Sequence, residues 1–171
     1  MAGSKILVDE RKSAIGLAAS PEQGWAALWW VGVLLTTVSL ADIALAFYPA
    51  RFGVMEWEFG TGASTIASLP LVAIGLAALM GSALARGRRG RVIVVVILLI
   101  ILALGTLAML TVFLLDLPVA LKSVASPDIK LGIQKACVKT VLLGVAFPVG
   151  FLVAAVGALR RLQAGKRKIQ A

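Results

Sequence analysis

The stretch VIVVVILLIILALGTLAMLTVFLL, which runs from Val92 to Leu115, contains neither a charged residue nor a proline. A helix rises about 1.5 Å per residue, so about 20 residues of this kind cross the roughly 30 Å of hydrocarbon in a bilayer. A surface helix of a soluble domain keeps a polar face toward water, and this stretch has none. The stretch therefore predicts a membrane-spanning helix.

Three more apolar runs of similar length occur in the 171-residue chain, which is 60% hydrophobic and only 15% charged. An ordinary soluble domain is about a quarter charged. We predict an all-α fold, with four transmembrane helices in an up-down bundle within one membrane domain of residues 25–159. The predicted spans are Trp25–Tyr48, Ser64–Ala85, Val92–Leu115 and Val138–Leu159, with an N-terminal segment (1–24) before them and a basic tail (160–171) after them.

The distribution of basic residues predicts the orientation of these spans. Twelve lysines and arginines lie in the N-terminal segment, the second connector and the tail, against five in the first and third connectors. The positive-inside rule then places both termini in the cytoplasm. Because the basic residues flank the spans and form no stripe with interleaved aromatics, the net charge of +9 does not indicate nucleic acid.

Two absences limit the chemistry. The chain has no histidine, and Cys137 is its one cysteine. Catalytic triads that depend on histidine, most zinc sites, bis-histidine haem and redox cysteine pairs are therefore excluded. We predict a protein that is not an enzyme and that binds no metal or cofactor.

Asp42 is the single acidic residue inside a predicted span. A charge in the bilayer costs at least a few kcal/mol at the centre, so such a residue is a functional candidate by default. Thr36, Ser39 and Asp42 follow one another at a spacing of three and would form a polar ribbon on the first helix. Two interpretations are open: a hydrogen-bonded clasp between helices, with Lys139 or Arg51 as partner, or a site that handles a proton or a cation.

The first connector, RFGVMEWEFGTGAS (51–64), concentrates acidic and aromatic residues. If it alternates like a strand, Glu56 and Glu58 point one way and Trp57 and Phe59 point the other way. Glycines 60 and 62 would then allow a tight turn into the second span. The segment has three interpretations, which in order of preference are a structural loop, a docking surface and a catalytic carboxylate pair.

A polar layer is predicted on the same side of the bundle. Asp116 ends the third span and Lys139 begins the fourth, so the two could pair and fix the register of the helices. The residues 117–137 between them form either a separate amphipathic helix or the beginning of a fourth helix that starts at Pro127. The predicted outer polar layer consists of Arg51, Glu56, Glu58, Asp116 and Lys139.

Aromatic and basic residues mark the membrane surfaces. The aromatic residues at the ends of the first span are typical interface anchors, and Trp57 and Phe59 are candidate docking residues. These anchors are Trp25, Trp29, Trp30 and Tyr48. The residues predicted to contact anionic lipid headgroups are Arg86, Arg88, Arg89, Arg91, Arg160 and Arg161.

Lines of small residues predict where helices approach closely. The second span has two, Ala73, Ala77 and Gly81 on one line and Gly75, Ala78 and Ser82 on another, and the fourth has Ala146, Gly150 and Ala154. Such lines let helix backbones come together in lipid. The third span has few small residues, so we expect it to be the helix most exposed to lipid.

Three short motifs suggest a family. They are PARFGVMEWEFG (49–60) after the first span, Leu69-Pro70-Leu71 in the second, and Lys139-Thr140 at the start of the fourth. With the four-pass layout, this pattern resembles small bacterial inner-membrane proteins of the HpsJ-like group. The resemblance implies a bacterial inner-membrane location and an accessory role in export or cell-envelope polysaccharide systems. It transfers no catalytic residue.

These observations predict a non-enzymatic membrane accessory or structural subunit of a larger assembly. Its expected partners are the lipid bilayer, anionic headgroups, and other membrane subunits or further copies of itself. Docking is expected through the outer loop 49–63 and the outer segment 116–139. The alternative is a small oligomeric transporter or channel that uses Asp42 as its coupling acid.

Overall fold

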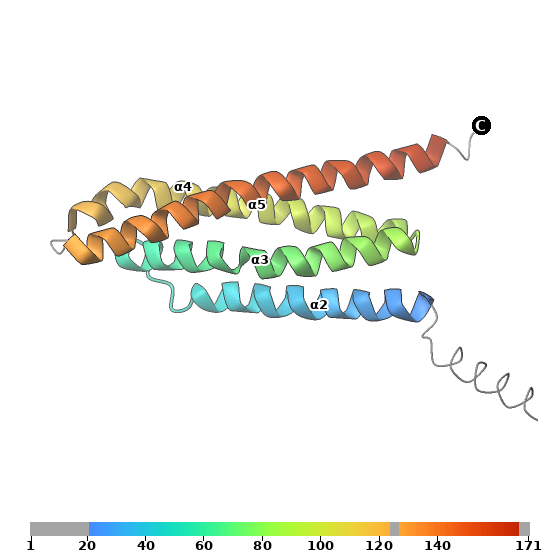
Figure 1. Ribbon diagram of the computed structural model, residues 1–171, viewed down its shortest axis with the longest axis horizontal. Coiled ribbons are helices and arrows are strands. Elements are labelled where there is room, and N and C mark those ends of the chain that lie inside the picture. Colours follow the sequence, from blue (N-terminus) through green and yellow to red (C-terminus); the bar gives the residue numbers. More distant parts are fainter. Residues whose placement is uncertain (1–20, 124–126, 168–171) are drawn as a thin grey trace, which may run out of the picture.

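The computed structural model describes residues 21–123 and 127–167, and every regular element within them is an α-helix. The helices alternate in direction along one axis, as Figure 1 shows. Each is long and apolar enough to cross a membrane, which confirms the predicted four-span, all-α fold. Their bounds are Pro21–Ala46 (α2), Met55–Ala85 (α3), Arg89–Ser123 (α4) and Pro127–Arg167 (α5). Most of the predicted N-terminal segment and residues 168–171 of the tail lie outside the described residues.

Local sequence signals explain where the helices begin and turn. Both α2 and α5 begin at a proline that is followed by an acidic residue, as the sequence predicts. Between α3 and α4 the backbone turns at Gly87, which has a φ of +61°. The N–H groups of residues 86–88 bond to carbonyls of the last turn of α3. A short, arginine-rich turn therefore joins the two helices.

Helix α3 begins at Met55, earlier than the predicted span at Ser64. The expected strand-like alternation over Glu56–Phe59 is wrong, because these residues form the first turns of the helix. Glu58 stabilises this start, since its Oε1 accepts a hydrogen bond of 2.7 Å from the N–H of Gly53. The tight turn also lies at Gly53, where φ is +85°, and not at glycines 60 and 62.

The third connector holds no separate amphipathic helix. Helix α4 continues through Pro118 to Ser123, and α5 is one continuous helix from Pro127, which was one of the two alternatives. With 41 residues, α5 is about 60 Å long, roughly twice the thickness of the hydrocarbon layer. Both ends of α5 therefore extend beyond the apolar span.

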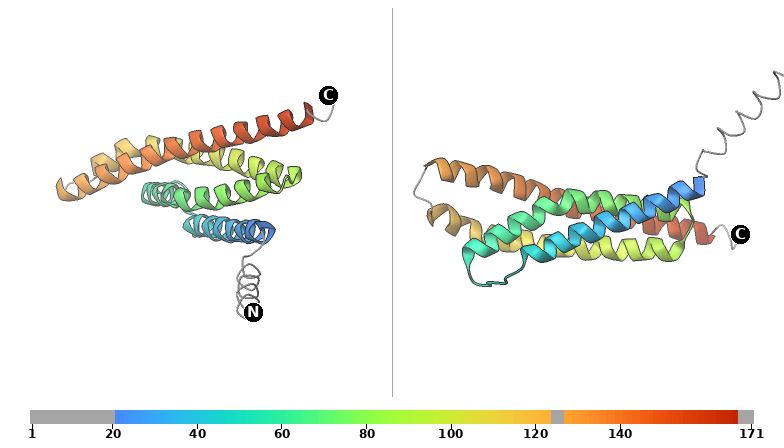
Figure 2. Two further views of the ribbon diagram at one scale, coloured as in Figure 1. Left: turned by 45° about the vertical axis from the view of Figure 1, so that its right-hand side comes forward. Right: turned by 90° about the horizontal axis from the view of Figure 1, so that it is seen from below.

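Helix α3 is the centre of the bundle. Its backbone lies close to the backbones of α2, α4 and α5, whereas α2 lies against α3 alone among the described helices. Figure 2 shows α2 at the edge of the molecule. The prediction that 92–115 would be the most exposed span is wrong, because 17% of the apolar window of α2 is buried against 33% of that of α4.

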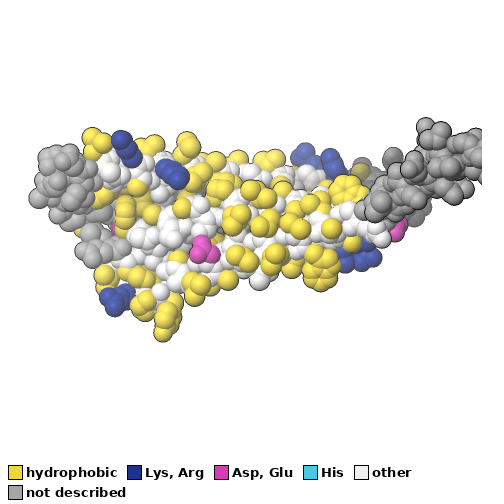
Figure 3. All heavy atoms as spheres, turned by 60° about the horizontal axis from the view of Figure 1, so that its bottom comes forward, with side chains coloured by type: hydrophobic (Ala, Val, Ile, Leu, Met, Phe, Trp, Pro, Cys, Tyr) yellow, Lys and Arg dark blue, Asp and Glu magenta, His cyan; other side chains and the backbone are white. Residues whose placement is uncertain are grey.

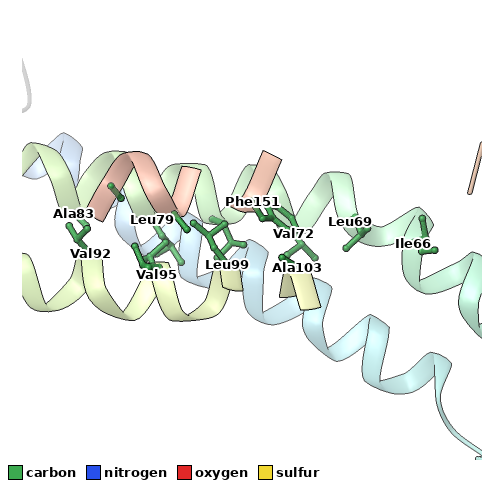
Figure 4. Packing of buried hydrophobic residues seen from close by; sticks show 14 of the residues in the cluster. Ile66, Leu69, Val72, Leu79, Ala83, Val92, Val95, Leu99, Ala103 and Phe151 are labelled. Carbon is green, nitrogen blue, oxygen red and sulfur yellow. The ribbon is translucent and has the colours of Figure 1, made fainter. Parts of the chain in front are cut away.

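Apolar side chains of α3, α4 and α5 form the core (Figure 4). Fully buried members include Leu69, Val72, Val95, Leu99 and Phe151. Helix α2 adds only half-buried side chains to this cluster. Around the core, apolar side chains cover the face drawn in Figure 3, and lysines and arginines lie toward its two ends. The chain is a multi-pass membrane protein built as a three-helix core with α2 attached to one side.

We name the two ends of the bundle after the residues that lie there. The connector end holds the α2–α3 connector (47–54) and the adjoining ends of α4 and α5. The arginine end holds residues 86–91 and Arg160 and Arg161. The sequence predicts that the arginine end faces the cytoplasm.

Candidate functional site

The contact between α2 and α3 depends on two glycines. A Cβ added to Gly75 would lie 2.9 Å from the backbone nitrogen of Thr36, and one added to Gly32 would lie 3.0 Å from the carbonyl oxygen of Gly75. No side chain fits at either position without moving backbone. The helices therefore cross in close contact, as small residues allow in lipid.

Polar side chains continue this contact toward the connector end, and we call the whole α2–α3 contact the polar seam. Thr36 and Ser39 are buried in it. The Ser39 hydroxyl donates to the carbonyl of Leu35 at 2.7 Å, whereas Oγ1 of Thr36 has no hydrogen-bond partner among the described residues. The predicted polar ribbon thus faces α3 and does not line an open path.

Helix α3 contributes matching polar residues that the sequence analysis did not single out. The Thr61 hydroxyl donates at 3.3 Å to the carbonyl of Ala46, one of the free carbonyls in the last turn of α2. Thr65 lies on the same face and is buried, and Ser68 follows it. Their spacings of four and three, set beside the ribbon on α2, are the signal that would have indicated this pairing.

Asp42 takes part in the seam at its exposed edge. The Ser68 hydroxyl donates to Oδ2 of Asp42 at 3.0 Å, and the aspartate itself is exposed. The observed partner is therefore Ser68, whereas the sequence had suggested Lys139 or Arg51. This geometry matches a hydrogen-bonded clasp between two helices.

Both candidate docking aromatics pack within the molecule. Trp57 is half-buried and meets the rings of Phe47 and Phe52 edge-on, with centroids 6.2 and 5.1 Å away. Phe59 stacks on Phe113 of α4 at 4.7 Å. The aromatics that stay exposed at this end are Tyr48 (82%) and Phe52 (78%). Of these two residues, only Tyr48 was a candidate in the sequence analysis.

The outer polar layer forms only in part. The carboxyl groups of Glu58 and Asp116 lie near enough for their charges to interact. Oδ2 of Asp116 is buried without a hydrogen-bond donor among the described residues. The expected pair of Asp116 and Lys139 is not among the described contacts. Arg51 and Lys139 are exposed, and the side chain of Glu56 lies outside the described part.

At the arginine end, Arg91 connects α4 to α2. Its guanidinium lies over the ring of Trp29, 4.3 Å from the centroid, in a cation–π contact. Trp29 is therefore more than an interface anchor, whereas Trp25 and Trp30 are exposed as expected. The other predicted headgroup residues at this end, Arg88, Arg89, Arg160 and Arg161, are exposed, and Arg86 is half-buried.

The Ala73 line of α3 and the Ala146 line of α5 do not pack together. Instead they line an open apolar groove of about 540 Å³ between α3 and α5. No atom lies within 4 Å of a Cβ added to Gly81 or Gly150. The close approach of α5 occurs at Gly144, where an added Cβ would lie 2.9 Å from Leu110 and 3.3 Å from Ile66. The groove is lined by Ala73, Leu76, Ala77, Met80, Gly81, Leu84, Leu99, Ala146, Phe147, Gly150, Phe151 and Ala154.

Fold and contacts define a four-helix, multi-pass membrane protein with a polar seam, an outer carboxyl pair and an apolar groove. Within the described residues, no group of three or more cysteine, aspartate or glutamate side chains could hold a metal ion. No family model, curated protein or solved structure matches the chain. The resemblance to the HpsJ-like group therefore stays a prediction.

Proposed function

We propose that this protein is a non-enzymatic accessory or structural subunit of a larger assembly in a bacterial inner membrane. It docks partners at the connector end, through the α4–α5 hairpin formed by residues 116–123 and 127–139 and through the exposed aromatics of the connector. The location follows from the four spans and the resemblance stated above. The docking role follows from the shape of the hairpin.

The supporting observation is the length of α4 and α5 beyond their apolar spans. Helix α4 continues from Leu115 to Ser123, which adds about 12 Å. Helix α5 begins at Pro127, about 16 Å before the predicted span at Val138. Crossing the bilayer requires neither extension. A regular helical pair that projects from the membrane provides a rigid surface, which loses little conformational freedom when a partner binds.

The exposed side chains of the hairpin indicate the chemistry of the partner. Lys122, Lys135 and Lys139 are exposed, and Leu131 is 54% exposed beside them. A complementary surface would place acidic groups opposite the lysines and an apolar patch opposite the leucine. Tyr48 and Phe52 on the neighbouring connector extend this surface with two exposed rings.

The transporter alternative receives less support from the same contacts. A coupling acid must be reached from both sides of the membrane, but Asp42 lies at the edge of a seam that the Gly32–Gly75 crossing closes. Because α2 lies against α3 alone, only further copies of the chain could enclose that edge. The accessory role needs no such rearrangement.

At the opposite end, we place the exposed arginines against the anionic headgroups of the cytoplasmic leaflet. Each basic residue near such a surface contributes about 1 kcal/mol. This contact would fix the depth of the bundle and leave the connector end free for partners.

Site-specific photo-crosslinking in native membranes tests the docking role. A photoreactive residue at position 131 or 135 should give one discrete protein adduct, and Lys122→Glu with Lys139→Glu should abolish it. The matched control is position 101 in the middle of α4, where Ile101 is 59% exposed and should give lipid adducts only. If positions 131 and 135 give the same lipid pattern as position 101, the docking proposal is wrong.

A further inference from the structure

The apolar groove between α3 and α5 has no occupant from the described residues, 21–123 and 127–167. Small residues on both helices form its walls, and Leu99 of α4 contributes to its lining. Its volume of about 540 Å³ is that of a typical small-molecule pocket, for which about 300–1,000 Å³ is usual. If this open groove stayed empty, its lining atoms would lack packing partners on one side. Within a membrane, an apolar group must fill it.

The length of the groove corresponds to one leaflet. Along α3 it extends from Ala73, near the middle of the span, to Leu84 near the arginine end, which is about 16 Å. Half of the hydrocarbon thickness is about 15 Å. The close contact of Gly144 with Ile66 and Leu110 lies just beyond the other limit of the groove on α5. A transmembrane helix would need the full thickness, whereas a lipid chain needs one leaflet.

At the arginine end the groove adjoins a charged cavity, which we call its mouth. This second cavity of about 260 Å³ shares Leu84 with the groove and is lined by Arg89 of α4 and Arg161 of α5. These two arginines come from different helices, line the same cavity and are both exposed. Arginine binds phosphate oxygens through charge-assisted hydrogen bonds.

From these observations we infer that the groove and its mouth form a binding site for a single anionic phospholipid of the arginine-side leaflet. One acyl chain lies between the small residues of α3 and α5, and the phosphate contacts Arg89 and Arg161. The site deepens the proposed headgroup contact and rests on it. It also explains why the small-residue lines do not bring α3 and α5 together.

Native mass spectrometry of the detergent-purified protein, with phosphatidylglycerol and phosphatidylcholine added as competing probes, tests the site. The wild type should retain one phosphatidylglycerol in preference to phosphatidylcholine. Arg89→Gln with Arg161→Gln should weaken that binding roughly thirtyfold, the loss expected for two basic residues at a membrane surface. The charge control is Arg160→Gln, which removes an exposed arginine outside the mouth and should change the affinity little.

Gly150→Leu tests the groove independently of charge. Its Cβ meets no atom within 4 Å, so the new side chain fills the groove without displacing the bundle. Bound phosphatidylglycerol should be lost while the melting temperature is kept. The matched control is Gly105→Leu on α4, which also has open space around its Cβ but does not line the groove, and which should keep the lipid.

Three outcomes would overturn the site. A loss from Arg160→Gln as large as that from Arg89→Gln with Arg161→Gln, with no effect of Gly150→Leu, would leave only a general headgroup contact. No preference for phosphatidylglycerol in any variant would remove both the site and that contact. A dimer without lipid that dissociates in Gly150→Leu would show that a second copy occupies the groove.

Discussion

The two sides of α3 bind their neighbours in different ways. Toward α2, the helix presents Gly75 and the hydroxyl groups of Thr61 and Ser68, and the backbones nearly touch. Toward α4 and α5, it presents aliphatic side chains such as Ile66 and Leu76, which pack with Phe151 and their other neighbours in the core. One helix thus combines a polar close contact with an apolar interdigitated core.

The difference shows what each contact can tolerate. In lipid, burial of apolar surface gives no driving force between helices, so packing and hydrogen bonds remain. The core side distributes its packing over many side chains of two helices. The seam concentrates it on two glycines and a few hydroxyl groups, and the backbone of α2 lies close to no second described helix, although the Arg91–Trp29 contact joins it to α4. We therefore expect large truncations to act most strongly in the core and small insertions to act most strongly at the seam.

The largest effect is expected from Phe113→Ala. This residue has no exposed surface and stacks on Phe59, so its loss leaves a cavity between α3 and α4. The free energy of unfolding should fall by about 3 kcal/mol, the low end for such truncations because the water-transfer contribution is absent in lipid. Reversible unfolding in mixed micelles measures it. Leu115→Ala is the control, because Leu115 is 72% exposed, and equal losses in both would contradict the internal role of the aromatic stack.

Gly75→Leu should have the next largest effect and should act on α2 specifically. The new Cβ would collide with the backbone of Thr36, and overpacking of this kind costs about 1–3 kcal/mol. Spin labels at the exposed positions 38 and 74, with Cys137 replaced by serine, should report a longer α2–α3 distance. Gly60→Leu on the same helix has open space around its Cβ and should leave that distance unchanged. An unchanged distance in Gly75→Leu would mean that the glycine crossing does not hold α2.

The sequence predicted the spans because the signal for a membrane helix is local. A run such as Val92–Leu115 has the composition and length to cross the bilayer whatever surrounds it. The start of α3 was predicted too late in the chain, because the alternation of Glu56–Phe59 is too short to distinguish a strand from a helix. Glu58 accepts a hydrogen bond from the N–H of Gly53, which favours the helical start, and this contact becomes visible only in three dimensions.

The contacts between helices were harder to predict than the helices. Both small-residue lines of the second span have the spacing for close packing, yet only the line with Gly75 makes the close contact, whereas Ala73, Ala77 and Gly81 line the groove. Spacing identifies a face that could be approached, but which neighbour approaches it depends on the arrangement of all four helices. The sequence analysis grouped Thr36, Ser39 and Asp42 on one ribbon of α2, but it did not indicate the partner Ser68.

Arg91→Gln should have a smaller effect on the attachment of α2. The cation–π contact with Trp29 joins α2 to α4 at the arginine end, and such contacts contribute about 0.5–1 kcal/mol at exposed sites. The unfolding free energy should fall by that amount. The control Arg88→Gln removes an exposed arginine of the same turn, and a loss of equal size there would point to net charge as the cause.

The smallest effect is expected at the Asp42–Ser68 hydrogen bond, and it also separates the two interpretations of Asp42. Ser68→Ala removes the donor and should cost about 0.6 kcal/mol, the average for hydrogen bonds between transmembrane helices. Asp42→Asn should cost less, because the amide oxygen still accepts from Ser68. If Asp42 serves only as a clasp, the double variant should lose no more than Ser68→Ala alone, since Ser68→Ala already removes the bond that Asp42→Asn would only weaken. A proton gradient should also drive no flux through wild-type protein in vesicles. Proton-coupled flux that Asp42→Asn abolishes without loss of stability would instead make the aspartate a coupling acid, and the exposed edge of the seam would then be its pathway.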